Sequence, residues 1–325
     1  MPVRTLSKAI NTGLRRALED DPKVVVMGED VGGLGGVFRV TDGLQKDFGS
    51  DRVVDTPLAE ASIVGTAIGL ALRGYRPVCE IQFDGFVYPA FSQIVSQLAK
   101  LRARTAGLLA VPVVIRIPVG GGIGAVEHHS ESNEAYFAHT AGLRVVCCSN
   151  PQDAHWMLRQ AVRCDDPVIF YEPKRRYWSK AEVDESVERV PPLDKATIVR
   201  PGRDLTLLTY GGMVQTCLDA AEAATADGRD IEVVDLRTLS PLDLDTITAS
   251  VHRTGRCVVA HEAPTFAGLG AEIGSAVTER CFYRLEAPVL RVGGFNTPYP
   301  PAKLEEQYLP DLDRVLDTVD RAFAF

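Results

Sequence analysis

The chain has 325 residues, of which 46% are hydrophobic and 24% are charged, and its formal net charge is −8. This length suits two domains with sizeable cores, and the negative charge argues against nucleic acids and anionic membranes as partners, because both attract basic surfaces. No apolar run reaches the roughly 18 residues of a membrane span, and the 7 cysteines include no C-x-x-C pair, so we expect a cytoplasmic protein in a reducing compartment.

The first half of the chain alternates between apolar runs and helical patterns. An amphipathic helix is expected within MPVRTLSKAINTGLRRALEDD at the N-terminus. Runs without polar alternation, which are typical of strands buried on both faces, are VVVMG (24–28), RPVCEI (76–81), VPVVIRI (111–117), LRVVCC (143–148) and PVIFYE (167–172). Helical patterns lie between them, at YPAFSQIVSQLAKLRAR (88–104) and PQDAHWMLRQAVRC (151–164). The sequence therefore predicts a mainly parallel, doubly wound α/β sheet.

The segment RVVDTPLAEASIVGTAIGLALRG (52–74) contains an unusual helix. It carries no charge between Glu60 and Arg73, whereas a surface helix has a polar face, so we expect it to be buried nearly all round. Glu60 follows the end of a short strand and begins the helix. A carboxylate there offsets the helix dipole by about 0.3–1 kcal/mol. From its position alone, this structural role explains Glu60 as well as a functional role does.

A charged, proline-punctuated segment interrupts the alternation after the last of these strands. We expect residues 1–185 to form the first domain, residues 186–203 a linker and residues 204–325 the second domain. Within the second domain, strands are expected at 205–212, 231–239, 257–262 and 288–294, with helical patterns between them. The sequence thus predicts a second, smaller doubly wound α/β domain.

Polar side chains gather where predicted strands end, which is where open parallel sheets place their ligands. They are Glu29 and Asp30 after strand 24–28, Asp55 and Glu60 around the start of the uncharged helix, and the loop AVEHHSES (125–132) with His128 and His129. Solvated turns or a surface patch are the simpler alternatives for the first and last groups. Adjacent histidines do not converge easily on zinc, so we expect no zinc site. The polar loop 125–132 is the strongest candidate for a functional site.

The glycine-rich stretch GGGIGA (120–125) satisfies G-x-G-x-x-A after a predicted strand. A dinucleotide-binding fingerprint also needs an immediate helix and an acidic residue about 20 positions further on, and both are missing here. We expect these glycines instead to let the backbone approach a ligand or a neighbouring subunit closely. Unaided, the residues predict a two-domain α/β protein with an acid–histidine site.

Several segments, in order over residues 3–323, resemble the beta subunit of the thiamin-diphosphate-dependent first component of 2-oxo acid dehydrogenase complexes. They are MGEDVGGLGGVFRVTDGL, DTPLAEASIVGTAIGLALRGYRPVCEIQF, HHSESNEAYFAHTAGLRVV, LRTLSPLDLDTI, HEAPTFAGLGAEI and GGFNTPYPPAKLEEQYLPD. The resemblance implies a transketolase-like pyrimidine-binding domain followed by a transketolase C-terminal-like domain. EIQFDGFVYPAF, HEAP, RLEAP and TPYPP are more similar to the branched-chain type than to the pyruvate type.

The resemblance also implies roles for individual residues. Glu60 matches the glutamate that hydrogen-bonds the cofactor's aminopyrimidine ring and thereby activates the cofactor. His129 matches a histidine near the substrate that handles protons during decarboxylation or acyl transfer. The positions that match the walls of the cofactor pocket are Glu29, Leu58, Gln82 and Phe86.

Partners and ions follow from the same resemblance. The chain lacks the Gly-Asp-Gly stretch that binds Mg²⁺ in thiamin enzymes, so Mg²⁺ is expected on a separate alpha subunit within a heterotetramer of two alpha and two beta chains. Further expected partners are a lipoyl acyltransferase core and a small 2-oxo acid. Relatives hold a potassium ion near the positions of Ala161, Cys164 and Asp166. The alternatives are a pyruvate or acetoin dehydrogenase beta subunit, or a non-catalytic assembly subunit.

Overall fold

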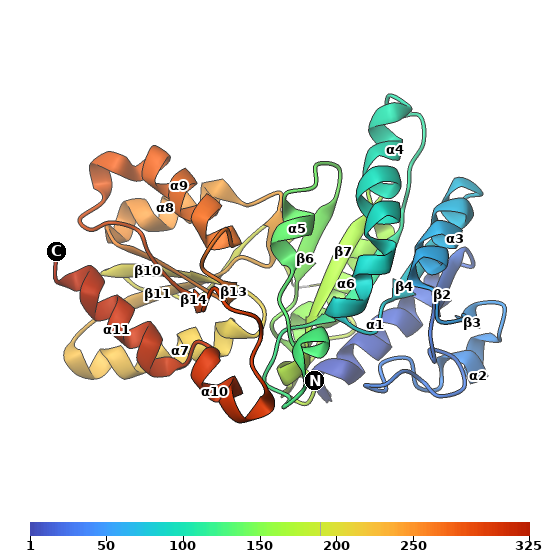
Figure 1. Cartoon of the computed structure of the whole chain (residues 1–325), viewed down its shortest axis with the longest axis horizontal. Coiled ribbons are helices and arrows are strands. Elements are labelled where there is room, and N and C mark those ends of the chain that lie inside the picture. The colour runs from blue at the N-terminus through green and yellow to red at the C-terminus, as the bar shows by residue number, and fades with distance from the viewer. Residues whose placement is uncertain (189) are drawn as a thin grey trace.

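The computed structural model describes residues 1–188 and 190–325, so residue 189 of the expected linker 186–203 lies outside the described part. Two α/β lobes lie side by side, the N-terminal lobe in blue to green and the C-terminal lobe in yellow to red (Figure 1). This arrangement confirms the predicted pair of α/β domains. The boundaries at residues 185 and 204 stay predictions.

The first sheet has the strand order β12-β6-β7-β5-β4-β2-β3. Its strands are β2 (Val24–Gly28), β3 (Val53–Asp55), β4 (Arg76–Glu80), β5 (Val114–Val119), β6 (Arg144–Cys147), β7 (Val168–Pro173) and β12 (Thr238–Ser240). β12 pairs antiparallel with β6, and the other pairs are parallel. Every residue of β2, β5 and β7 is buried, which explains why these strands lack polar alternation.

Helices cover both faces of the first sheet. They are α1 (Leu6–Asp20), α2 (Leu44–Phe48), α3 (Glu60–Leu72), α4 (Ala99–Arg104), α5 (Glu134–Ala138) and α6 (Pro151–Arg163). The apolar faces of α1 and α6 share one core, and α3 packs in the other. The helical run expected at 88–104 consists of a 3₁₀ helix (Asp84–Ala90), a π-helix (Gln93–Leu98) and α4. The doubly wound fold is therefore confirmed.

Helix α3 is not buried all round in this chain, so that prediction was wrong. Ile63, Val64 and Ala67 are buried, whereas Ser62 and Thr66 are exposed. With 3.6 residues per turn, the exposed residues Ser62, Thr66 and Gly69 form one face that is small and uncharged, and Leu72 is exposed at the end of the helix. The lack of charge therefore marks an uncharged exposed face rather than complete burial within the chain.

The second sheet has the order β14-β13-β10-β11-β9. Its strands are β9 (Thr197–Arg200), β10 (Leu205–Thr209), β11 (Ile231–Asp235), β13 (Cys257–Pro264) and β14 (Leu290–Gly294). Its helices are α7 (Met213–Ala224), α8 (Leu244–Thr254), α9 (Leu269–Cys281), α10 (Glu305–Tyr308) and α11 (Leu312–Phe323). β9 lies inside the range expected to be a linker and pairs antiparallel with β11. A small separate sheet pairs β1 (Val3–Thr5) with β8 (Lys180–Glu182).

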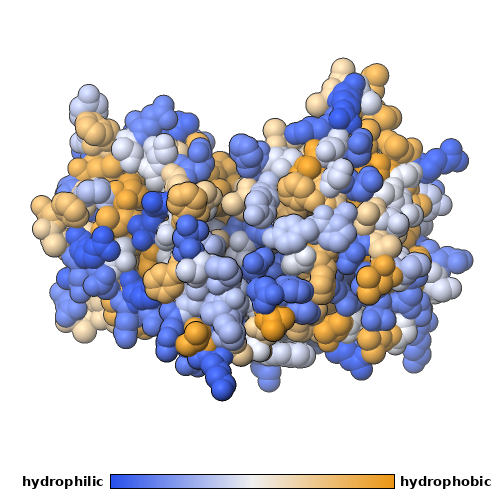
Figure 2. All heavy atoms as spheres, viewed as in Figure 1, coloured by the Kyte–Doolittle hydropathy of each residue, from blue (hydrophilic) through white to orange (hydrophobic). Residues whose placement is uncertain are grey.

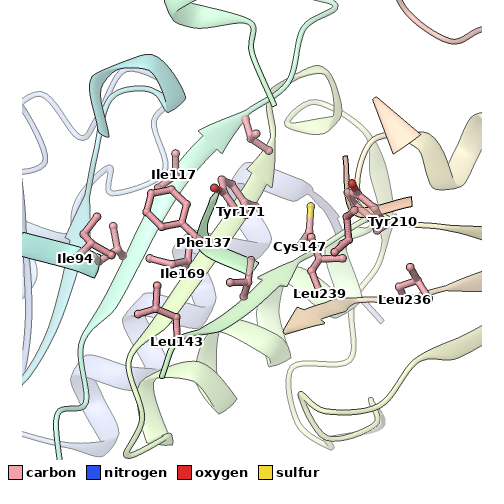
Figure 3. Close-up of a cluster of buried hydrophobic side chains, with 14 of the residues drawn as sticks. Ile94, Ile117, Phe137, Leu143, Cys147, Ile169, Tyr171, Tyr210, Leu236 and Leu239 are labelled. Atoms are coloured by element: carbon pink, nitrogen blue, oxygen red, sulfur yellow. The ribbon is translucent and has the colours of Figure 1, made fainter. Parts of the chain in front are cut away.

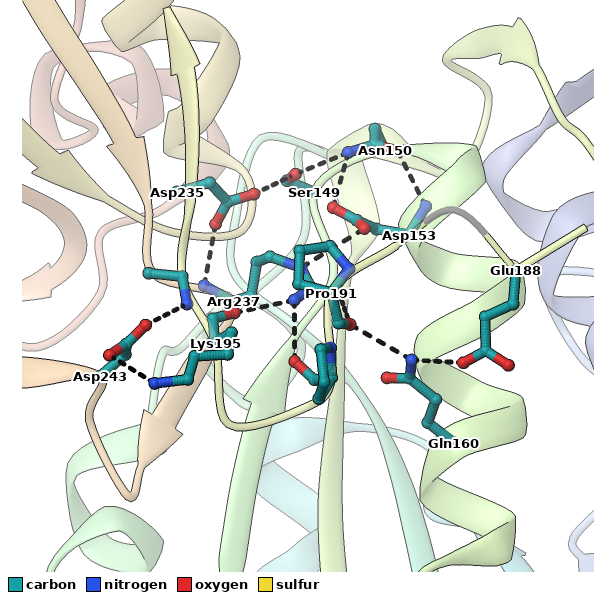
Figure 4. A network of polar contacts seen from close by, with 12 residues as sticks. Ser149, Asn150, Asp153, Gln160, Glu188, Pro191, Lys195, Asp235, Arg237 and Asp243 are labelled. Carbon is teal, nitrogen blue, oxygen red and sulfur yellow. Dashed lines mark hydrogen bonds and ion pairs between the residues drawn. The ribbon is translucent and has the colours of Figure 1, made fainter. Parts of the chain in front are cut away.

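The run 231–239, expected to be one strand, is divided between the two sheets at Arg237. The backbone of Arg237 has a φ of 56°, and its side chain is fully buried. Its guanidinium donates to the carbonyl oxygens of Pro192 at 3.2 Å and Lys195 at 2.8 Å (Figure 4). These contacts hold the chain in a turn, so β11 stays in the second sheet and β12 joins the edge of the first. The single-strand prediction was wrong because distant partners decide this turn.

The two domains share a continuous apolar core. Tyr210, Leu236 and Leu239 of the second half pack in the same cluster as Phe137 and Cys147 of the first (Figure 3). Cys147 is buried and forms no disulfide, so it acts as a small core residue. Because apolar burial spans the junction, the lobes support each other.

The surface of the face seen in Figure 2 mixes hydrophilic and hydrophobic side chains and is hollowed between the C-terminal lobe and α4. In the described part of the chain, no helix combines the length and the apolar character needed to cross a bilayer.

Candidate functional site

The carboxyl ends of three neighbouring strands bring the predicted site residues together. β5, β4 and β2 are adjacent in the sheet. Glu29 follows β2, Gln82 follows β4, and the loop with His129 follows β5. The side-chain nitrogen Nε2 of Gln82 donates to the backbone oxygen of Glu29 at 2.6 Å. Two residues that are far apart in the sequence are thus joined at one edge, as expected for a parallel sheet.

The carboxyl group at the start of α3 lies close enough to that of Glu29 to affect its pKa. The side chain of Glu60, the first residue of this helix, is buried with a residue exposure of 7%. Burial raises the pKa of Glu29, and the nearby carboxylates of Glu60 and Asp30 raise it further. The atom Oε1 of Glu29 is buried and has no hydrogen-bond partner among the described residues. A buried acceptor without a partner is costly, so this arrangement suits a ligand that supplies hydrogen bonds.

His129 lies against an aromatic wall. Its ring centroid is 4.6 Å from that of Phe83 and 5.1 Å from that of Phe86, which it meets edge-on. Its Nδ1 atom is buried and has no hydrogen-bond partner in the described chain. Burial lowers the pKa of His129, and the positive charge of Lys174 lowers it further. The neutral imidazole is therefore favoured at neutral pH and can accept a proton.

A buried ion pair lies behind this wall and was missed by the sequence analysis. The ammonium of Lys174 contacts the carboxylate of Asp84, and both side chains are fully buried. Burial raises the pKa of Asp84 to about 7 although Lys174 opposes this shift. Lys174 also lies 5.4 Å from the centre of the Phe83 ring. The pair thus places a positive charge beneath the aromatic ring that contacts His129.

A second buried network supports Gln82. Arg116 donates to Glu172 at 2.6 and 2.9 Å and to Glu80 at 2.6 Å, and its side chain is fully buried. Glu80 in turn accepts a hydrogen bond from Gln82 at 3.5 Å. The tyrosine hydroxyl of Tyr177 donates to Glu172 at 2.6 Å. These bonds link the interior of the sheet to Gln82, which in turn binds the backbone of Glu29.

Comparison with known proteins decides the family. Residues 3–179 match the transketolase pyrimidine-binding domain and residues 194–315 the transketolase C-terminal domain. A pyruvate dehydrogenase E1 component subunit beta of Leifsonia xyli is 62% identical over 98% of this chain and 94% of its own length. A 3-methyl-2-oxobutanoate dehydrogenase subunit beta of Mycobacterium tuberculosis is 56% identical over 98% of this chain and 91% of its own. The chain belongs to the beta subunits of 2-oxo acid dehydrogenases.

A third relative, a 2-oxoisovalerate dehydrogenase subunit beta of Pseudomonas aeruginosa, is 50% identical over 96% of this beta subunit and 92% of its own chain. Beta subunits of this family are parts of thiamin-diphosphate-dependent oxidoreductases and act together with an alpha subunit. Among solved structures, a split-gene transketolase, described as an inactive β4 tetramer, superposes with a TM-score of 0.78 at 23% identity and covers 98% of both chains. That likeness supports the fold alone.

The site of the beta subunit fits an aminopyrimidine. Glu60 offers a buried carboxyl group, Phe86 a half-buried ring, and Glu29 and His129 offer buried polar atoms without partners among the described residues. Leu58 stands apart, because it precedes α3 and is 80% exposed in the single chain. The side chain of Leu58 is therefore accessible to a ligand or to a partner chain, and its expected contact with the cofactor stays a prediction.

In the segment expected near potassium, an arginine side chain binds two of the backbone carbonyl groups. Nη1 of Arg76 donates to the carbonyl oxygens of Val162 at 3.0 Å and Cys164 at 3.1 Å, while the carboxylate of Asp166 bonds to Arg102 and Arg144. The guanidinium of Arg76 therefore binds two carbonyl groups of this turn. Within the described residues, no group of three or more His, Cys, Asp or Glu side chains is placed to hold a metal ion.

Proposed function

We propose that this beta subunit forms a heterotetramer with an alpha subunit, decarboxylates a branched-chain 2-oxo acid and reductively acylates lipoyl groups on an acyltransferase core. One observation carries the proposal. The buried carboxyl group of Glu60 lies near Glu29, at the sheet edge that also presents Gln82 and His129. The uncharged exposed face of α3, which Glu60 begins, supports close contact with a partner chain.

Thiamin diphosphate, when bound, supplies an acidic carbon that adds to the carbonyl group of a 2-oxo acid. Glu60 would share a proton with the ring nitrogen of its aminopyrimidine, Phe86 would cover the ring face, and Gln82 would fix the backbone beside it. Mg²⁺ and the diphosphate would rest mainly on the alpha subunit. His129, held neutral, would accept or return a proton at Nδ1 near the substrate.

Pyruvate is the second candidate substrate, and the relative at 62% identity favours it. The branched-chain assignment rests on the two relatives at 56% and 50% identity and on the segments EIQFDGFVYPAF and TPYPP. The test is to purify this chain together with its alpha subunit and to offer 2-oxoisovalerate, pyruvate and acetoin side by side.

We expect 2-oxoisovalerate to show the highest kcat/KM, by roughly tenfold over pyruvate, because extra methyl groups contribute binding in an apolar pocket. A preference for pyruvate would replace the branched-chain assignment with the second candidate. A lack of turnover with every substrate, in a fully assembled and cofactor-loaded complex, would support the non-catalytic assembly subunit.

We further propose that Arg76 takes the place that potassium has in relatives. Exchanging potassium for sodium is therefore expected to leave the Tm of the complex unchanged. Arg76→Ala is expected to lower the Tm by roughly 3–8 °C, because charged hydrogen bonds to partly buried carbonyl groups are lost. Differential scanning calorimetry checks both results, with the exposed neighbour Arg73→Ala as the control. A Tm that depends on potassium in the unaltered chain would contradict this proposal.

A further inference from the structure

The glycine-rich loop that carries His129 is held by the second domain. Residues 120–131 form a loop whose ends are closed by a hydrogen bond of 3.0 Å from the backbone N–H of Gly120 to the carbonyl oxygen of Glu131. These glycines were expected to let the backbone approach a ligand or a neighbouring subunit, and that expectation stays a prediction. Within this chain, Gly120 and Gly121 lie against Glu262 and Tyr299 of the C-terminal domain, and Gly122 lies against Arg175 of the first domain.

Carboxylate groups bind the backbone of this loop. The N–H groups of Gly122 and Gly124 donate to the two oxygens of Glu305 at 2.9 and 2.8 Å, and the N–H of Gly121 donates to Glu262. The hydroxyl of Tyr299 donates to Glu305 at 2.7 Å. Glu305 has an exposure of only 7%, whereas Gly122 and Gly124 are exposed, so these bonds are partly buried at the edge of the contact. We call Glu262, Tyr299 and Glu305 the carboxylate clasp.

The charge state and the backbone both suit this contact. Burial would raise the pKa of Glu305, but the hydroxyl of Tyr299 and the N–H groups of the loop hold the pKa below its usual range. A side chain at Gly121 would place its Cβ 1.8 Å from the hydroxyl oxygen of Tyr299, and Gly122 has a φ of +82°. Glycine is therefore required at positions 121 and 122 for these contacts to form. It also leaves the loop free to adopt many conformations when the clasp is absent.

We propose that Glu305 is a positioning residue for His129. The clasp fixes the first half of the loop, the Gly120–Glu131 bond fixes its ends, and the segment between carries the histidine against Phe83 and Phe86. The second domain would thus determine where the proton-handling side chain lies. The catalytic part of this inference rests on the proposed function, whereas the holding of the loop does not.

The first experiment measures hydrogen exchange in the complex with the alpha subunit. Glu305→Ala is expected to speed exchange of the amides in residues 121–131 by roughly tenfold or more, while the strands of both sheets stay protected. Glu306→Gln, which removes a neighbouring but exposed carboxylate, is the matched control and is expected to leave the loop unchanged. Glu305→Gln keeps one acceptor oxygen and provides an intermediate variant if the alanine variant assembles poorly. Unchanged loop exchange in both Glu305 variants would overturn the proposal.

The second experiment is a double-mutant cycle on lipoyl acylation. Glu305→Ala is expected to slow this step roughly tenfold when His129 is present, because a small displacement of a catalytic group has a large kinetic cost. In the His129→Ala background the same change is expected to slow it by less than about twofold. Equal factors in both backgrounds would show that Glu305 acts on general stability and would overturn the inference. If His129→Ala alone has no effect, the proposed function fails at His129, and the exchange experiment still decides whether the clasp holds the loop.

Discussion

Turnover of the assembled enzyme is expected to fall about a hundredfold or more when Glu60 is replaced by alanine. The carboxyl group is buried at the start of α3, near Glu29, and a methyl group there has no proton to share with an aminopyrimidine ring. The tetramer is expected to remain assembled, because Glu60→Ala leaves the exposed, uncharged face of α3 unchanged. Steady-state kinetics with 2-oxo acid, together with size-exclusion chromatography, measures both outcomes.

Glu60→Gln sharpens this experiment. The amide keeps the size of the side chain but cannot exchange a proton as a carboxyl group does, so the variant is expected to be nearly as inactive as Glu60→Ala. Ser62→Ala, on the exposed face of the same helix, is the control for a general effect on α3. If Glu60 only offsets the helix dipole, both variants would lose about 0.3–1 kcal/mol of stability and keep near-normal turnover. That result would reject the catalytic role.

Much of the fold was predictable because burial on both faces leaves a clear pattern. β2 begins and ends at the residues that the run VVVMG predicted, since every one of its side chains is buried. The division of 231–239 was not predictable, because the apolar letters continue on both sides of Arg237. Partners of its guanidinium more than 40 positions away, the carbonyl group of Lys195 and the carboxylate of Asp153 among them, hold the chain in this turn. Contacts of that range leave no periodicity in the sequence.

The site shows the same division. Glu29, Gln82 and the loop with His129 follow adjacent parallel strands and lie at one edge of the sheet. The strand pattern predicted this for Glu29 and His129, whereas Gln82 was expected only from the family resemblance. Arg116 and Lys174 were missed, since a charged letter inside or after an apolar strand does not reveal its partner. Their carboxylates lie up to 56 and 90 residues away in the chain, respectively. The supporting charges of the site therefore required the three-dimensional structure.

Lipoyl acylation is expected to fall about a hundredfold in His129→Ala, and decarboxylation measured with an artificial electron acceptor is expected to fall less. The imidazole lies against Phe83 and Phe86 with Nδ1 buried and unbonded within the described residues, so it is placed to exchange a proton near the substrate. Acyl transfer needs a proton donor or acceptor at the incoming dithiolane, whereas an artificial acceptor removes electrons without that step. The reverse order of the two losses would contradict the proton-handling role.

His128 provides a control for His129→Ala, and the pH profile of lipoyl acylation provides a second test. His128 is exposed and pairs with Glu127 at 3.0 Å, so His128→Ala is expected to leave both rates within about twofold of normal.

Burial and then Lys174 lower the pKa of His129 below the usual 6.5, so the imidazole stays neutral as the pH falls through that value. In the pH profile of lipoyl acylation, the loss that depends on His129 is therefore expected only at lower pH. Lys174→Met removes the positive charge that lowers the pKa of His129, so it is expected to move that loss toward higher pH. An unshifted profile would show that the buried ion pair does not influence the protonation of His129.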